Sequence, residues 1–154
     1  MGTLISDTLT RRWVTVPLKS EDHEGVIREV LGPMTDHLHV KNWDQLFRET
    51  WTRELKESTC IGNGIAFPHA RCEAVDQLVI AAGVHAAGVN FSGVPGKIHL
   101  IFSIGTPLKM GKEYLAVVGS LARFLKDESV RQKLMQSKTA DQFCSVLYAA
   151  EKQS

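Results

Sequence analysis

His69 is the residue whose neighbours best equip it for chemistry, because it directly follows Pro68 in a glycine-containing stretch. Histidine has an unperturbed pKa of about 6.5, so a neutral and nucleophilic ring nitrogen is present near neutral pH. Pro68 fixes its own φ and drives Phe67 toward extended geometry, which holds the imidazole at a defined angle. Gly62 and Gly64 let main-chain N–H groups approach an anion closely. These residues predict a histidine nucleophile beside a phosphate group, with a structural Pro-His turn as the alternative.

The other five histidines have settings that favour structural roles. His37 and His39 alternate in an extended stretch, but a metal site needs a third or fourth ligand that no nearby residue supplies, so we expect two solvated histidines and no metal. His85 and His99 end or interrupt apolar runs, where histidine is usually a hydrogen-bonded structural residue. His23 lies near an expected helix start and is predicted to be at the surface.

Other phosphate and nucleophile motifs are missing from the sequence. Gly96-Lys97 is followed by Ile98, so there is no P-loop, and Gly62 and Gly64 lack the third glycine of a dinucleotide loop. There is no G-x-S-x-G elbow, and no pair of acidic residues is marked out for acid–base work. The sequence therefore argues against nucleotide binding and serine hydrolysis, and it predicts no cofactor.

Length and composition indicate one ordinary globular domain over residues 1–154. The 18 basic and 17 acidic residues are scattered, which argues against nucleic acid or anionic lipid as a partner. No apolar run approaches the roughly 20 residues of a membrane-spanning helix, and the N-terminus does not read as a secretory signal, so we expect a cytoplasmic protein without direct membrane insertion. The three cysteines are widely spaced and fit neither a disulfide framework nor a structural zinc site.

The first half of the chain predicts a strand and two helices before the His69 stretch. Pro17 confines the strand expected over residues 13–18 to a sheet edge, because proline cannot donate to a central ladder. Asn42 is expected to cap a helix over residues 42–57. Residues 58–70 have no helical period and predict a loop, a short strand and a loop.

The second half predicts buried strands followed by helices. Residues 78–84 and 98–104 have the length and β-branched content of buried strands. Residues 112–126 predict a helix. Its expected apolar face consists of Tyr114, Leu115, Val118, Leu121 and Leu125. The remaining predicted helices start at Ser20, with a break or kink at Gly32-Pro33, at Asp127, and at Thr139 with Gln142 in the capping-box position. Strands interspersed with helices indicate an α/β sandwich.

Arg53, Ser58-Thr59, residues 61–66 and Pro68-His69 together resemble the enzyme IIA domain of the fructose, mannitol and nitrogen-related class of the bacterial phosphoenolpyruvate-dependent phosphotransferase system. The motif block covers residues 53–70, and the order of elements is compatible along nearly the whole chain. The resemblance implies an α/β fold with a mixed β-sheet flanked by helices on both faces.

The resemblance also implies a phosphotransferase component with a phosphohistidine intermediate. His69 would accept a phosphoryl group from the phosphorylated histidine-containing phosphocarrier protein or its nitrogen-branch counterpart. It would pass the group to a sugar-specific permease component or use it as a regulatory signal to a target protein. The alternative is a nitrogen-type regulatory interaction module whose partner binding is switched by His69 phosphorylation, or which has lost that phosphorylation.

Arg53 is predicted to neutralise charge on the phosphoryl oxygens, since its planar fork binds two oxygens at once. A solvated arginine on the outer side of its helix is the alternative. The Thr59 hydroxyl and the main chain of Gly62, Asn63 and Gly64 are expected to add neutral donors to the same oxygens. No metal is required.

Tyr114 departs from the resembled family, whose members commonly place a second histidine at the start of this helix, just before a leucine. A tyrosine can donate a hydrogen bond to a phosphate oxygen, but with a pKa near 10 it cannot shuttle a proton near neutrality. Tyr114 is therefore predicted either as a catalytic residue or as a core aromatic. His85 or His99 can replace the second histidine only if the fold brings one of them to His69.

Overall fold

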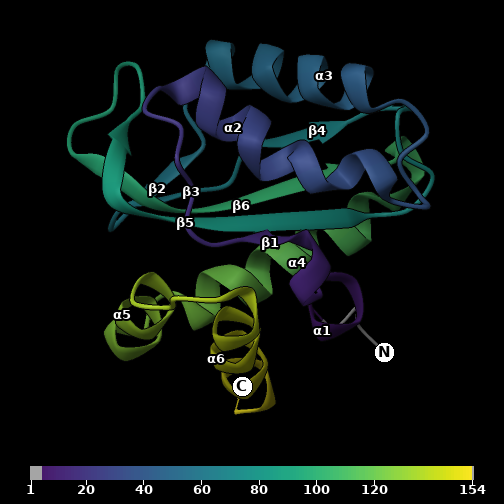
Figure 1. Ribbon diagram of the computed structural model, residues 1–154. Helices are drawn as coiled ribbons and strands as arrows, with labels where there is room; N and C mark the ends of the chain where they lie inside the picture. The colour runs from purple at the N-terminus through teal and green to yellow at the C-terminus, as the bar shows by residue number, and fades with distance from the viewer. Residues whose placement is uncertain (1–4, 154) are drawn as a thin grey trace.

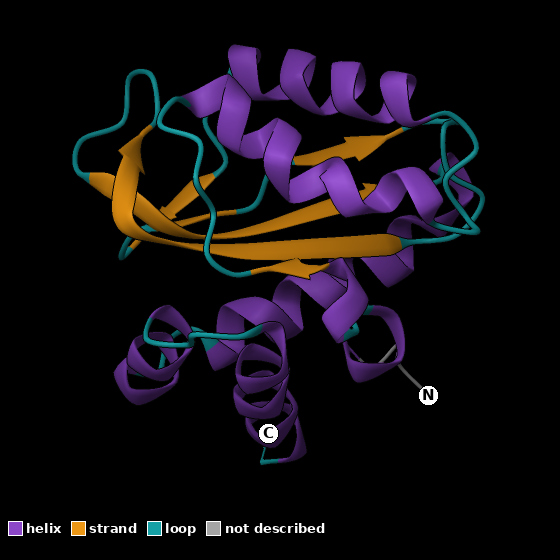
Figure 2. Cartoon of the chain, viewed as in Figure 1, coloured by secondary structure: helices purple, strands orange, loops and turns teal. Residues whose placement is uncertain are grey.

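A mixed β-sheet lies between two layers of helices in the computed structural model, which describes residues 5–153 (Figures 1 and 2). The sheet has six strands in the order β1-β5-β6-β3-β2, with β4 also paired to β6. The strands are β1 Val14–Thr15, β2 Cys60–Gly62, β3 Ile65–Ala66, β4 His69–Arg71, β5 Val79–Asn90 and β6 Lys97–Thr106. The predicted α/β class with a mixed sheet is confirmed, while residues 1–4 and 154 of the predicted 1–154 domain lie outside the described residues.

Helices cover both faces of this sheet, as predicted (Figure 1). One face carries α2 His23–Leu31 and α3 Trp43–Lys56. The other face carries α1 Ile5–Thr8, α4 Gly111–Phe124, α5 Glu128–Met135 and α6 Ala140–Lys152. Short 3-10 turns span Arg11–Trp13, Gly32–Asp36 and Leu108–Met110. Of the helices within residues 5–153, none has both the length and the apolar character needed to cross a membrane.

The antiparallel pair of β5 and β6 forms the centre of the sheet. Val79 lies opposite Gly105 and Asn90 opposite Lys97, so both strands run beyond the predicted 78–84 and 98–104. His85 ends the apolar run of β5, and Lys97 and Gly105 bound that of β6, so the runs from which strand length was read are shorter than the strands. β1 pairs in parallel with the outer side of β5 and is an edge strand, as Pro17 predicts, although it ends at Thr15.

The stretch 58–70 contains three short strands where one was predicted. β3 and β4 lie one after the other along β6, with Ile65 opposite Leu100 and His69 opposite Ile104. Because each strand has only two or three residues, the period-2 alternation that reveals a strand is too short to read. This end-to-end arrangement decides how far each residue of the stretch lies from His69.

The predicted N-caps show how local signals start the helices. Asn42 accepts a 3.0 Å hydrogen bond from the Gln45 N–H, and Thr139 accepts one of 3.1 Å from the Gln142 N–H, so both predictions are confirmed. Asp127 caps α5, also as predicted. The first long helix, predicted to start at Ser20, is capped by Asp22 and begins three residues later than predicted, at His23. Its predicted break takes the form of the 3-10 turn that contains Gly32 and Pro33.

The buried face of α4 differs from the predicted one. Val117, Leu121 and Phe124 are buried, whereas 69% of Leu115 is exposed. The predicted and the observed buried residues both recur at helical spacing. The spacing of apolar residues is therefore compatible with two overlapping faces of the helix. Packing on the sheet selects the face centred on Leu121, which leaves Leu115 and the partly buried Tyr114 free to face other groups.

Leu121→Ala is expected to lower the free energy of unfolding by about 2 to 5 kcal/mol, because it opens a cavity under a fully buried side chain. Leu115→Ala removes the same atoms from the same helix and should change stability by less than about 0.5 kcal/mol, since that side chain is mostly exposed. Urea denaturation of the two variants measures the difference. Equal losses would contradict the orientation of α4.

Candidate functional site

His69 opens strand β4, and a single hydrogen bond defines the chemistry of its ring. Nδ1 lies 3.0 Å from the carbonyl oxygen of Phe67. A carbonyl can only accept, so Nδ1 carries the proton and donates it. Nε2 therefore keeps its lone pair, which is the form of imidazole that can attack an electrophile.

The backbone that supplies this carbonyl is held from both sides. The Phe67 N–H donates to the Thr59 carbonyl at 3.1 Å, and the Pro68 carbonyl accepts from the Ile104 N–H at 3.0 Å. The geometry expected from Pro68 is thus reinforced by pairing with β6. The imidazole is positioned by the sheet and not by a free loop.

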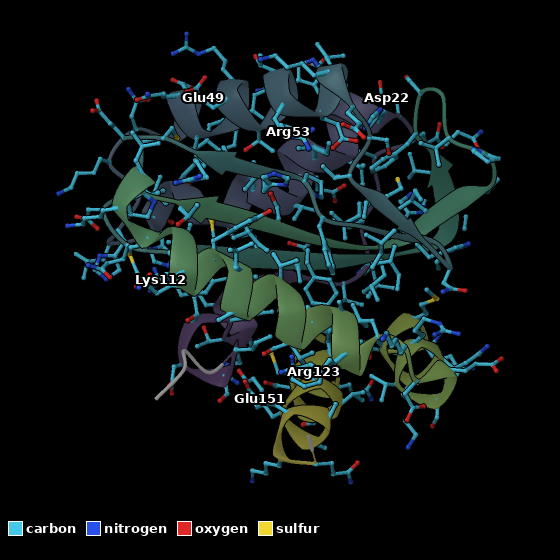
Figure 3. All side chains as sticks on the ribbon, turned by 180° about the vertical axis from the view of Figure 1, so that it is seen from behind. Asp22, Glu49, Arg53, Lys112, Arg123 and Glu151 are labelled. Atoms are coloured by element: carbon cyan, nitrogen blue, oxygen red, sulfur yellow. The ribbon has the colours of Figure 1, made fainter. Side chains whose placement is uncertain are left out.

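His69 lines an open cavity of about 280 Å³ between α3 and β4. The lining residues are Glu49, Thr52, Arg53 and Lys56 from α3 and His69, Ala70 and Arg71 from β4. Figure 3 shows Glu49 and Arg53 on α3, with α4 on the other side of the strands. Three cationic side chains face one carboxylate here, so the cavity has a positive potential suited to an anion.

Arg53 reaches this cavity from the last turn of α3. Its Nη1 donates a 2.9 Å hydrogen bond to the Glu57 carbonyl, which ties the guanidinium to the C-terminal end of its own helix. A guanidinium has five N–H donors, so this bond leaves donors for a ligand. The structure brings Arg53 and His69 to one cavity.

Tyr114 meets His69 from the start of α4, with ring centroids 5.3 Å apart and ring planes at 42°. Burial raises the pKa of the Tyr114 phenol, while the positive charges of Arg53 and Arg71 act in the opposite direction. The phenol is therefore a hydrogen-bond donor near neutral pH and not a base. α3, β4 and α4 together bring Arg53, His69 and Tyr114 into one group.

The turn of Gly62, Asn63 and Gly64 does not lie beside His69. All three residues have positive φ, at 93°, 57° and 76°, because they form the tight turn between β2 and β3. The Gly64 carbonyl accepts from the His99 N–H, and at strand rise Gly64 is about 16 Å from His69. The predicted main-chain cradle for the His69 phosphate is therefore not formed, since these glycines serve the hairpin.

Thr59 also has a different partner from the predicted one. Its hydroxyl donates a 2.7 Å hydrogen bond to Glu54 Oε1, away from the cavity lining. The other carboxylate oxygen of Glu54 lies 3.1 Å from His23 Nε2, and the Ser92 N–H donates to His23 Nδ1. Since Nδ1 accepts, Nε2 holds the ring proton and donates it to Glu54.

This buried group of His23, Glu54 and Thr59 was not predicted from the sequence. His23 is 7% exposed, so its predicted surface position is wrong, because its ring stacks on Phe91 with centroids 3.9 Å apart. Burial opposes ionisation of Glu54, but the hydrogen bonds from His23 and Thr59 outweigh burial and hold its pKa below the ordinary value. The group fixes the end of α3 next to Arg53.

His85 and His99 have structural partners at the far end of the sheet, as the sequence indicates. His85 Nε2 donates to the Ser20 carbonyl at 2.9 Å, and His99 Nδ1 donates to the His85 carbonyl at 3.0 Å. His99 is five residues along β6 from Ile104, the partner of His69, or about 16 Å. Neither histidine replaces the second histidine of the resembled family.

His37 and His39 are not a metal pair in the structure. His39 Nδ1 lies 2.8 Å from Asp76 Oδ1, and the His37 ring packs on Trp13 with centroids 4.4 Å apart. Across residues 5–153, no cluster of three or more His, Cys, Asp or Glu side chains has the arrangement to hold a metal ion.

Arg71, like Lys56, is a cationic cavity residue that sequence reasoning missed. It lies two residues after His69 in β4, and its Nη2 donates a 2.9 Å hydrogen bond to the Leu108 carbonyl. Residues two apart in a strand point to the same side, so the spacing is a usable signal once His69 is known to open a strand. A strand of three residues is too short to show an alternation that would reveal it.

Residues 7–150 match the family described as phosphoenolpyruvate-dependent sugar phosphotransferase system, EIIA 2. The chain belongs to this family. EIIA domains are components of a sugar phosphotransferase system, so this chain is one such component. The fold and the recognition of the family from the Arg53 to Ala70 block are both confirmed.

Relatives of this EIIA chain include fructose-specific PTS components and nitrogen regulatory proteins. The PTS system fructose-specific EIIA component of Haloferax volcanii is 31% identical over 80% of the chain and 81% of its own length. The PTS system fructose-specific EIIABC component of Bacillus subtilis is 29% identical over 96% of the chain, which spans only 24% of that protein. The crystal structure of nitrogen regulatory protein IIA-Ntr from Neisseria meningitidis has a TM-score of 0.83 at 26% identity, covering 94% of this chain and 99% of that one.

Glu54→Gln is expected to destabilise the protein by about 1 to 3 kcal/mol near neutral pH, because its amide NH₂ would face either the His23 N–H or the Thr59 hydroxyl donor. The depressed pKa of Glu54 stabilises the fold above the unfolded value near 4.5, and this contribution is lost as pH falls through the lower folded value. The difference from wild type should therefore shrink in acid. Urea denaturation across this pH range measures it.

Glu57→Gln is the matched control, since it changes an exposed glutamate just beyond the end of the same helix. We expect little effect at any pH. A Glu54→Gln variant as stable as this control near neutral pH would contradict the role of the buried group.

Proposed function

We propose that this chain is a phosphoryl carrier in which His69 Nε2 accepts a phosphoryl group from a phosphorylated histidine-containing carrier protein. The observation that carries the proposal is the hydrogen bond from His69 Nδ1 to the Phe67 carbonyl, which leaves Nε2 with its lone pair in a cationic cavity. The predicted cytoplasmic location and the identity of the upstream carrier are parts of this proposal.

The transfer exchanges one nitrogen–phosphorus bond for another. The Nε2 lone pair attacks phosphorus in line, the new Nε2–P bond forms, and the bond to the donor histidine breaks with its electron pair returning to that ring nitrogen. Nδ1 of His69 keeps its proton throughout and continues to donate it in the hydrogen bond to the Phe67 carbonyl. When the donor ring also keeps a proton on its other nitrogen, no proton moves, so the reaction needs no second histidine as a base.

Charge neutralisation and positioning are the remaining requirements of such a step. Arg53 supplies a guanidinium from α3 to the oxygens of the phosphoryl group, with Lys56 adding charge to the same cavity. Tyr114 donates a hydrogen bond from its phenol O–H to a phosphoryl oxygen from the α4 side, and its ring packs against the His69 ring. Rigid elements hold all three groups, and no cofactor takes part.

The downstream acceptor in this proposal is a sugar-specific permease component. The Bacillus subtilis relative joins EIIA with B and C components under one fructose-specific name. A cationic cavity that opens to solvent lets a second protein reach the phosphoryl group on His69. In this proposal the site binds the phosphoryl group and a partner protein, and the sugar binds to the permease component.

Incubation with labelled phosphoenolpyruvate and the upstream carrier proteins is expected to label the wild-type chain with acid-labile phosphate. His69→Ala should remain unlabelled because it removes the accepting nitrogen. His39→Ala is the matched control and should be labelled as wild type, since His39 lies outside the cavity. Arg53→Ala should slow labelling about tenfold or more. An unlabelled wild type in the presence of active carriers would refute the proposal.

A regulatory module switched by His69 phosphorylation is the second candidate, favoured by the likeness to nitrogen regulatory protein IIA-Ntr. A phosphoryl group adds up to two negative charges to the cavity and so changes what the surrounding surface can bind. We expect phosphorylated and unphosphorylated protein, each immobilised, to capture different partners from a lysate of the source cell. Identical capture, together with transfer of the phosphate to a permease component, would exclude this role.

A further inference from the structure

We infer that Arg71 is a second phosphoryl-binding arginine, which contacts the group on His69 Nε2 from the β4 side while Arg53 contacts it from α3. The inference rests on the proposed phosphoryl-carrier function and adds a residue to it. It assigns Arg71 the task of holding two phosphoryl oxygens through its planar fork.

The strand geometry places the two side chains together. His69 and Arg71 are separated by Ala70, so they project from the same side of β4, with Cα atoms about 7 Å apart at strand rise. Ala70 is buried and pairs with Gly105, and Arg71 pairs with Thr106, so β6 fixes this register. An arginine side chain spans that distance easily, and both residues line the same cavity.

The guanidinium of Arg71 is held by a bond that leaves its fork usable. Nη2 donates to the Leu108 carbonyl at 2.9 Å, which accounts for one of five N–H donors. The same nitrogen lies 3.4 Å from the position that a Cβ on Gly111 would occupy, so the guanidinium rests at the start of α4. Anchoring at this place limits the rotamers that Arg71 must give up when it binds a ligand.

Arg53 and Arg71 line one cavity, and the electrostatics of Tyr114 agree with that placement. The positive charges of both Arg53 and Arg71 act on the Tyr114 phenol, whose ring is 5.3 Å from that of His69. A dianion on His69 would lie among these three side chains. Two guanidiniums would then share the phosphoryl charge, where one arginine and one histidine serve in the resembled family.

A purely structural role for Arg71 is the competing interpretation, because its bond to Leu108 also holds the turn that precedes α4. Arg71→Lys separates the two roles. A lysine keeps the charge and can donate one hydrogen bond to Leu108, but it cannot present a planar fork to two oxygens. Arg123→Ala is the matched control, since it removes an equal charge from an exposed site in the last turn of α4 (Figure 3).

The experiment measures the initial rate of labelling from phosphoenolpyruvate through the upstream carriers, with the melting temperature of each variant alongside. Arg71→Ala should slow labelling roughly ten- to a hundredfold at an unchanged melting temperature, and Arg71→Lys should regain only part of the rate. Arg123→Ala should match wild type. Labelling of Arg71→Ala at the wild-type rate, or full recovery by Arg71→Lys, would overturn the inference.

Binding of inorganic phosphate to the unphosphorylated protein gives a test that needs no partner protein. A titration followed on the His69 ring resonances should show an affinity about fivefold or more weaker in Arg71→Ala than in Arg123→Ala. Equal affinities, or a wild type that does not respond, would overturn the role of Arg71. An unlabelled wild type whose phosphate response depends on Arg71 would instead refute the carrier function and retain this residue assignment.

Discussion

The hydrogen bond between His69 Nδ1 and the Phe67 carbonyl is the constraint on which the rest of the site depends. It fixes the tautomer, and the tautomer decides which nitrogen can act as the nucleophile. The Phe67 carbonyl is held in place for this bond by its neighbours. The Phe67 N–H donates to the Thr59 carbonyl, and the Pro68 carbonyl accepts from the Ile104 N–H. A local proline and a tertiary strand pair thus act together, and the ring enters the reaction already oriented.

The position of β4 explains how helices from opposite faces of the sheet serve one residue. β4 pairs with β6 on one side only among the described strands, so His69 stands at an open edge that α3 and α4 both reach (Figure 3). Glu54 and Thr59 tie the end of α3 to the start of β2, beside Arg53. The cationic side chains of α3 and β4 and the Tyr114 phenol of α4 are therefore all held on rigid elements. A reaction that depends on positioning requires such rigidity.

The sequence predicted correctly those features that depend on contacts between neighbouring residues, such as helix caps. Asn42 caps its helix as expected because the cap depends on the three residues that follow. The cradle assigned to the turn of residues 62–64 was wrong because its distance from His69 depends on the register of β3 and β4 along β6. His23 was misplaced for a similar reason, since the Phe91 ring that stacks on it and the Glu54 carboxylate that pairs with it are both distant in sequence. Arg71 was missed because a three-residue strand shows no readable alternation.

The atom that carries the phosphoryl group tests the central claim most directly. Phosphorylated protein with labelled histidine rings can be studied by nitrogen–phosphorus correlation NMR, which assigns the bond to one ring nitrogen. We predict phosphate on Nε2 of His69, with the proton retained on Nδ1 against the Phe67 carbonyl. Phosphate on Nδ1, or on a residue other than His69, would contradict the proposed arrangement of the site.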